Sequence, residues 1–312
     1  MKKNLMFLAL AATALASCNG GFKKGEGGLL YNIHTDKSTP AAQVGDFASL
    51  SVVAKNDGDS VLFSTYDAGH PQYMLLQKPA FKGDIYDGLL LLSEGDSATL
   101  KLSADSLFKT GQRPPNFKGK YIIYDIKVEK VIPKGKLTDQ VFQDNVTSYI
   151  NSQKEADKTG ESKKVESYIA GTKLNFNKTA SGLRYIITKP GSGPAIALND
   201  TAVVRYVGRF FNGKIFDTNI KAEAEKAKQV NPQAPYEPIR FAVGQRSVIQ
   251  GWDEGMQLLN KGAKASFVIP SNLAYGEQGN PPVGPFTPLT FDVEIVDIIK
   301  GVPPTAPKPA VK

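Results

Sequence analysis

Two β-rich stretches of this chain carry the same short patterns in the same order, and this repeat limits the possible folds more than any other feature. The matching segments, first copy and then second, are residues 28–31 and 182–185, 58–64 and 212–217, 88–95 and 255–262, and 124–128 and 291–295. The third pair reads Gly-Leu-Leu-Leu-Leu-Ser-Glu-Gly and Gly-Met-Gln-Leu-Leu-Asn-Lys-Gly. Matches that keep one order across two stretches indicate two copies of one fold.

Each copy combines strands with one short helix. Residues 47–53 and 121–128 alternate apolar and polar side chains, as half-buried antiparallel strands do, and the turn signal Asn-Asp-Gly stands at residues 56–58 between them. In the second copy Trp252, Met256 and Leu259 fall on one face of a helix, which suits packing on a sheet. The sequence therefore predicts an α+β protein whose two domains are each an antiparallel sheet wrapped on a short helix.

A helical connector is expected between the two copies. Phe142, Val146 and Tyr149 follow helical spacing, and Thr138 is a suitable N-cap. A charged stretch at residues 154–164 that includes Gly160 predicts a break, followed by a second short helix. Such a connector serves either as a rigid spacer or as an arm that forms a homodimer, and the sequence alone leaves both readings open.

The N-terminus has the features of an export signal. A positive start is followed by an apolar run, residues 5–16, that is too short to span a bilayer. The run ends in Leu-Ala-Ser before Cys18, the only cysteine of the chain, which resembles a bacterial lipobox. An ordinary secretory signal is the alternative. Lipidation of Cys18 predicts a membrane anchor in the bacterial cell envelope, on the periplasmic side of the outer membrane.

These patterns divide the chain into six segments. We expect a lipoprotein signal peptide (1–17), a tether (18–27), a first β domain (28–132), a helical connector (133–172), a second β domain (173–300) and a proline-rich tail (301–312).

Composition excludes several classes of chemistry. The chain has two histidines and one cysteine, so neither a thiolate cluster nor a His-rich metal site can be built. Neither histidine stands in a nucleophile motif, and no glycine-rich phosphate loop is present. The formal charge is +8, but the lysines are spread along the whole chain, which is typical of a solvated basic surface and not of a nucleic-acid patch. We therefore expect no metal, no cofactor and no nucleic acid.

The second copy resembles the FKBP-type peptidyl-prolyl cis-trans isomerases along most of residues 180–300. The motifs that carry the resemblance are residues 203–208, 212–218, 241–244, 248–255, 269–270, 273–276 and 289–293. A helical insert at residues 219–236 departs from the smallest members of the family. The resemblance implies an isomerase that acts on X-Pro bonds of unfolded or partly folded envelope proteins; the alternative is a non-catalytic chaperone or binding module with the same fold.

The resemblance also implies the residues of a proline pocket. They are Tyr206, Phe216, Asp217, Val248, Ile249, Trp252, Tyr275 and Phe291, with Ile239 and Val283 as weaker candidates for the wall. By the resemblance, Trp252 is the floor under the proline ring, the Ile249 N–H holds the substrate backbone, Tyr275 donates a hydrogen bond, and Asp217 polarises the site beside Tyr206. The competing interpretation is that these aromatic residues only fill a core.

The first copy lacks these side chains. Alignment places Val53 opposite Tyr206, Ser64 opposite Asp217, Ile85 opposite Trp252 and Phe108 opposite Tyr275. Residues 89, 91 and 92 are leucines that keep the expected helix apolar. We therefore predict a degenerate, inactive domain that retains the scaffold.

Overall fold

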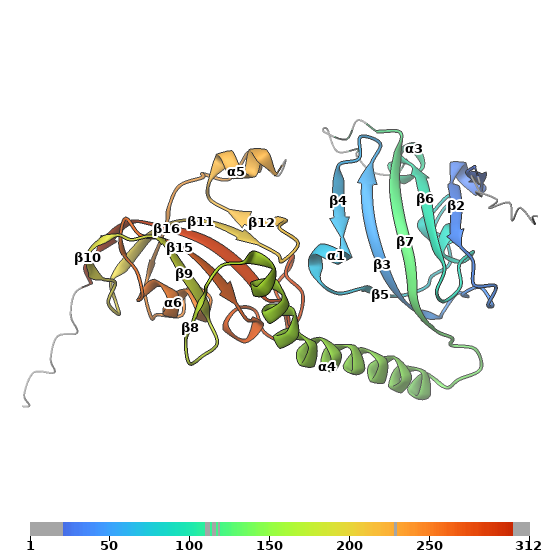
Figure 1. Cartoon of the computed structure of the whole chain (residues 1–312). Helices are drawn as coiled ribbons and strands as arrows, with labels where there is room; N and C mark the ends of the chain where they lie inside the picture. Colours follow the sequence, from blue (N-terminus) through green and yellow to red (C-terminus); the bar gives the residue numbers. More distant parts are fainter. Residues whose placement is uncertain (1–20, 110–112, 114–116, 118, 228–229, 302–312) are drawn as a thin grey trace, which may run out of the picture.

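Two β domains joined by one long helix make up the molecule, as Figure 1 shows. The computed structural model describes residues 21–109, 113, 117, 119–227 and 230–301. Within them every strand pairing is antiparallel, and the helices other than the connector are short.

The N-terminal domain is a single sheet with short helices, of which α2 packs on the buried face of the sheet. Its strands are β1 (Lys23–Lys24), β2 (Leu30–Thr35), β3 (Phe47–Asn56), β4 (Val61–Ser64), β5 (Gln72–Leu75), β6 (Ser97–Ser103) and β7 (Tyr121–Ile132). They lie in the order β1-β2-β6-β7-β3-β4, and β5 also pairs with β3. The helices are η1 (Glu26–Gly28), α1 (Thr65–Ala68), α2 (Ile85–Leu89) and α3 (Ala104–Leu107).

The C-terminal domain repeats this topology. Its main sheet contains β8 (Asn177–Lys178), β9 (Arg184–Lys189), β11 (Thr201–Arg209), β12 (Ile215–Thr218), β13 (Ile239–Ala242), β15 (Lys264–Ile269) and β16 (Leu289–Ile299). The order β8-β9-β15-β16-β11-β12, with β13 also on β11, reproduces the N-terminal order strand for strand. A small sheet joins β10 (Ser192–Ala195) to β14 (Asn260–Lys261), and the helices are α5 (Lys221–Lys226), α6 (Gln250–Met256) and η2 (Ser271–Leu273). The predicted α+β fold in two copies is confirmed.

Strand register corrects part of the alignment between the copies. In β3 the pairing with β7 shifts between Ser49 and Leu50, and in β11 the pairing with β16 shifts between Val203 and Val204. Val52 lies three residues after Ser49, and Tyr206 lies three residues after Val203. Val52, and not Val53, is therefore the counterpart of Tyr206 in the N-terminal domain.

The edge strands require the same correction. Phe63 pairs with Ala54 in β3, as Asp217 pairs with Gly208 in β11, so Phe63 and not Ser64 corresponds to Asp217. The predicted alignment was one residue out on both strands, because matched motifs do not reveal where a strand bulges.

A short helix packs close to the sheet in each domain, and glycines allow this approach. A Cβ at Gly255 would lie 2.7 Å from the Phe267 ring, and one at Gly88 would lie 2.5 Å from Leu100. Of the three leucines expected to keep this helix apolar, Leu89 and Leu92 are buried in the N-terminal core, whereas Leu91, which follows the end of α2, is 42% exposed.

The connector is one helix and not two. The structure has a single helix α4 (Asp139–Thr172), which Thr138 caps by accepting a hydrogen bond from the Val141 N–H at 3.4 Å. The predicted break is absent. A side chain at Gly160 would meet open space. A glycine inside a helix destabilises it by about 1 kcal/mol relative to alanine, and neighbours of good helix propensity such as Lys and Glu offset this loss.

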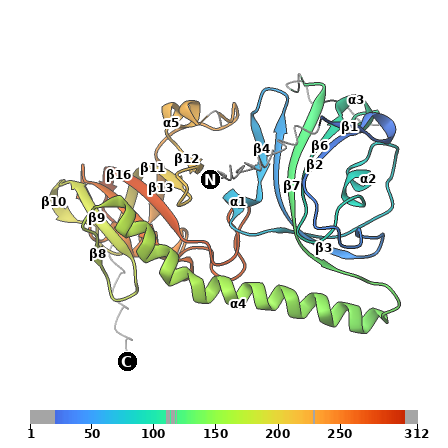
Figure 2. The same ribbon diagram turned by 45° about the vertical axis from the view of Figure 1, so that its right-hand side comes forward.

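Contacts at both ends of α4 favour the rigid-spacer interpretation. At the start, Phe142 and Val146 are buried with Phe47 and Ile132 of the N-terminal domain. At the far end, the Tyr168 ring stacks on a ring of the C-terminal domain. Figure 2 shows α4 running beneath both domains, with α1 and β4 of the first domain facing the second.

The signal peptide, Cys18 and the tail from residue 302 lie outside the described residues. Within the described ranges, no helix combines the length and apolar character that crossing a membrane requires.

Candidate active site

Four aromatic side chains from four elements meet on the concave side of the C-terminal sheet. Tyr206 comes from β11, Phe216 from β12, Trp252 from α6 and Phe291 from β16. The ring centroid of Trp252 lies 5.0 Å from that of Tyr206 and 5.3 Å from that of Phe291. The ring centroids of Phe216 and Phe291 lie 5.6 Å apart. All three pairs are edge-to-face, an arrangement that stabilises aromatic pairs by about 0.5–1.5 kcal/mol each. We call these four residues the aromatic box.

Trp252 lies at the centre of the box. Its side chain is 3% exposed, and Phe241 packs on it with a centroid distance of 5.7 Å. Within the described part of the chain, its indole N–H has no hydrogen-bond partner. Buried donors are rarely left unpaired, so this N–H is an exception within the core.

Polar groups gather at the rim of the box. The Tyr206 hydroxyl donates to Asp217 Oδ2 at 2.6 Å. Burial, and then the Asp217 carboxylate, raise the pKa of Tyr206. Burial and the same carboxylate raise the pKa of Tyr275. Both phenols therefore keep their protons near neutral pH and can donate hydrogen bonds.

Val248 and Ile249 precede α6 and pack, partly buried, against the core beneath the box. Ile249 is the N-cap residue of α6, and among the described residues its N–H has no backbone or side-chain acceptor. The loop before it is held by Asp253, whose carboxylate accepts the Gly244 N–H at 2.9 Å and the Arg246 N–H at 3.0 Å. A backbone donor is thus presented beside the box on a fixed loop.

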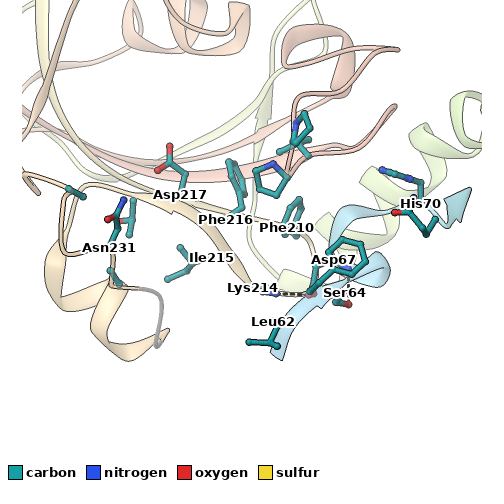
Figure 3. Close-up of a pocket in the computed structure, with 18 of the residues that line it drawn as sticks. Leu62, Ser64, Asp67, His70, Phe210, Lys214, Ile215, Phe216, Asp217 and Asn231 are labelled. Atoms are coloured by element: carbon teal, nitrogen blue, oxygen red, sulfur yellow. Dashed lines mark hydrogen bonds and ion pairs between the residues drawn. The ribbon is translucent and has the colours of Figure 1, made fainter. Parts of the chain in front are cut away.

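Five of the eight predicted site residues line two cavities, whereas Tyr206, Trp252 and Phe291 line neither of them. Phe216 and Asp217 line a cavity of about 590 Å³, together with the weaker candidate Val283 (Figure 3). Val248, Ile249 and Tyr275 line a second cavity. Tyr206, Trp252 and Phe291 join the two sides through the ring contacts described above. Ile239 packs partly buried against the same core.

Three residues that support the site were missed in the sequence. Asn219 accepts the Tyr206 N–H at 2.8 Å and donates to the Val204 carbonyl at 2.9 Å, which fixes the backbone under the box. Asp253 holds the loop before Ile249, and its place beside Trp252 in the motif was the available signal. Glu161 of α4 accepts hydrogen bonds from the Ser271 N–H and hydroxyl at 2.5 and 2.6 Å, just before Tyr275; nothing in the sequence indicated this contact.

The corresponding region of the N-terminal domain is apolar and lacks the polar rim. Register places Val52 at the position of Tyr206, Leu62 at that of Phe216 and Phe63 at that of Asp217. Tyr124 takes the place of Phe291, and Ile85 that of Trp252. The hydrogen-bonded pair of Tyr206 and Asp217 therefore has no counterpart.

Comparison with known proteins agrees with this geometry. A family model described as "FKBP-type peptidyl-prolyl cis-trans isomerase" matches residues 193–296. FkpA of Escherichia coli, named as an isomerase of this type, is 32% identical over 220 residues, which cover 70% of this chain and 72% of that protein. This chain belongs to the FKBP-type peptidyl-prolyl cis-trans isomerase family.

Other relatives match over shorter stretches. A probable FkpA of Neisseria meningitidis is 36% identical, over 55% of this chain and 61% of its own length. A probable FKBP-type isomerase of Haemophilus influenzae is 40% identical, and the chain spans 44% of it. The crystal structure of E. coli FkpA aligns with a TM-score of 0.42 at 32% identity, over 53% of this chain and 75% of that one.

Within the described residues, no group of three or more His, Cys, Asp or Glu side chains is placed to hold a metal ion.

The rim pair gives a first prediction. Replacing Asp217→Asn removes a charge-assisted hydrogen bond at an exposed carboxylate, so kcat/KM for an X-Pro peptide should fall about five- to tenfold, the equivalent of about 1 kcal/mol. The melting temperature should change by no more than a few degrees. The matched control is Asp292→Asn, since Asp292 is also exposed but binds Ser266 and Arg209 outside the box. Equal losses of activity in both variants would show that Asp217 acts only through general stability.

Proposed function

We propose that the C-terminal domain catalyses cis-trans isomerisation of X-Pro bonds in proteins of the bacterial envelope, with the aromatic box as its active site. The observation that carries the proposal is the box itself: four rings joined by edge-to-face contacts, in which Trp252 meets Tyr206 and Phe291, with phenol and amide donors at the rim. The residues of the box, of its rim and of the donors all lie within the sequence motifs that carry the resemblance to the family.

The proposed mechanism needs neither a nucleophile nor a metal, because no covalent bond breaks. Rotation about the X-Pro bond faces a barrier of ~18–20 kcal/mol, since resonance gives the C–N bond partial double-bond character. Uncatalysed exchange takes on the order of tens of seconds. The planar imide carries more charge separation than the twisted one, so an environment without water disfavours the planar form and lowers the barrier.

The individual roles are those that the family resemblance implies, and the positions described above support them. Trp252 lies under the proline ring, and Tyr206, Phe216 and Phe291 enclose it. The unpaired Ile249 N–H binds a carbonyl of the substrate backbone, which aligns the chain. Tyr275 donates to a substrate carbonyl as the imide twists, a pre-organised interaction that favours the twisted state. Asp217 orients the Tyr206 hydroxyl at the edge of the box.

A direct kinetic test decides between catalysis and binding alone. The full chain should accelerate cis-trans exchange of a Leu-Pro tetrapeptide, and residues 173–300 alone should do the same. A macrolide ligand of this family, such as tacrolimus, should compete with the peptide. A folded protein that binds unfolded chains but leaves the exchange rate at background would instead support the non-catalytic chaperone.

We further propose that Cys18 carries a lipid that anchors the protein to the envelope membrane. The support is the apolar run that ends in Leu-Ala-Ser before the single cysteine of the chain. Several acyl chains on one residue give firm anchoring, whereas one chain binds only marginally. The tether is then shorter than the predicted residues 18–27 and ends before β1, because Lys23 and Lys24 already pair with β2 in the N-terminal sheet.

Cell fractionation tests the anchor. Cys18→Ser should move the protein from the membrane fraction to the soluble envelope fraction, because the acceptor of the lipid is lost. The substitution Ser17→Ala, which leaves a small residue before the cysteine, should keep the membrane fraction unchanged. An unaltered membrane fraction for Cys18→Ser would contradict lipid anchoring.

A homodimer formed through α4 stays a prediction. The contacts of the helix with both domains support the spacer role more strongly, and sedimentation of the full chain separates a monomer from a dimer.

A further inference from the structure

A cavity of about 590 Å³ lies between the two domains, directly beside the aromatic box. One wall is formed by β4 and α1 of the N-terminal domain, and the opposite wall by β12 and the insert that follows it. Figure 3 shows Leu62 and Ser64 on one side and Phe216, Asp217 and Asn231 on the other. Its volume lies within the range of about 300–1,000 Å³ that is usual for ligand sites.

The N-terminal wall is an exposed apolar strand edge. Leu62 is 52% exposed and Phe63 44% exposed, and both line the cavity. β4 ends the order of its sheet, and in the described residues it pairs only with β3. Proteins normally shield such edges with charges or a covering segment, so an uncovered apolar edge is typical of a binding surface.

The opposite wall belongs to the proposed active site. Phe216 is part of the aromatic box, and Asp217 holds the Tyr206 hydroxyl. The cavity therefore adjoins the box at Phe216 and Asp217, and β4 lies across it from them.

The duplication explains how the inactive domain acquired this surface. Leu62 and Phe63 stand at the register positions of Phe216 and Asp217. At these two positions the edge strand of the N-terminal domain therefore carries apolar side chains, although the strand ends in Ser64. The loss of the polar rim produced an apolar edge that faces the box of the other copy.

Ion pairing holds the walls together and leaves the cavity without a strong net charge at that point. Asp67 of α1 accepts hydrogen bonds from Lys214 Nζ at 2.6 Å and from Asn212 Nδ2 at 2.9 Å, across the domain boundary. Lys214 and Asp67 neutralise each other, so the lining combines the apolar side chains of β4 with the carboxylate of Asp217 on the opposite wall.

We propose that this cavity binds the segment of the substrate next to the target proline, as an extended chain with apolar side chains that lies along β4. The inference rests on the proposed isomerase function of the adjoining box and names its substrate class: polypeptides with apolar residues within a few positions of the proline. An extended segment can use the free edge of β4 for backbone hydrogen bonds and Leu62 and Phe63 for side-chain contacts. Peptides that contain only the residues around the proline do not reach β4.

The experiment compares two probes on the full chain. One is a Leu-Pro tetrapeptide, and the other is a fluorescein-labelled dodecapeptide with the same Leu-Pro centre and Leu and Val on both sides. In the double variant Leu62→Ser, Phe63→Ser the dissociation constant of the dodecapeptide should rise about tenfold, the loss typical of truncating central contacts. The kcat/KM for the tetrapeptide should stay within about twofold of the parent protein, since neither residue belongs to the box.

Val61→Ser is the matched control, because Val61 is 46% exposed on the same strand but does not line the cavity. It should leave both probes unaffected. Circular dichroism checks that the variants are folded, and Leu62→Ser alone provides the same comparison if the double variant is not. Unchanged dodecapeptide affinity, or an equal loss in Val61→Ser, would overturn the inference.

Failure of the proposed function gives a different result. If the parent protein accelerates neither peptide but the dodecapeptide still binds more weakly to the double variant, the isomerase proposal fails and the cavity assignment stands.

Discussion

The distance between a short helix and its sheet determines what this fold can do. In the C-terminal domain, Gly251 and Gly255 let α6 approach β15 so closely that a Cβ at either position would lie within 2.7 Å of Ile269 or Phe267. This approach carries Trp252, which lies between the two glycines, into contact with Tyr206 and Phe291. Any larger residue at these positions would lift the helix and open the aromatic box to water. The proposed catalysis depends on keeping water out of the box. It therefore requires the same close approach of α6 to the sheet that the packing of the core requires.

The N-terminal domain keeps this packing but lacks the side chains of the aromatic box and its polar rim. Gly88 approaches Leu100 as Gly255 approaches Phe267, and the strand order is the same. The position of Trp252, however, holds Ile85, and the polar rim is replaced by Leu62 and Phe63. A scaffold kept without its site is understandable if its outer edge has taken on another use, and its position across the cavity from Asp217 suggests binding of the same substrate chain.

The repeat and the content of the box could be predicted from the sequence because both are carried by local motifs of several residues each. Trp252 and Phe291 stand in such motifs, and the structure brings them into contact. Strand register could not be predicted to the residue, since the bulges at Ser49 and Val203 leave no clear mark in the sequence. This is why Val53 was assigned in place of Val52. The unbroken course of α4 was also missed, because the contacts that hold its two ends outweigh the effect of Gly160 and appear only in three dimensions. The cavity between the domains depends on the same long-range contacts.

The central claim is that only the aromatic box of the C-terminal copy isomerises proline bonds, and one pair of matched variants tests it most directly. Exchange of a Leu-Pro peptide is measured by NMR for Trp252→Leu and for Ile85→Ala, its counterpart in the other domain, with circular dichroism showing that both are folded at the assay temperature. Loss of the ring from the floor of the box should lower the exchange rate by about 10- to 100-fold, as expected from about 1.5–3 kcal/mol of apolar contact. Ile85→Ala should leave it within about twofold. Equal rates for both variants, or full activity in folded Trp252→Leu, would contradict this account.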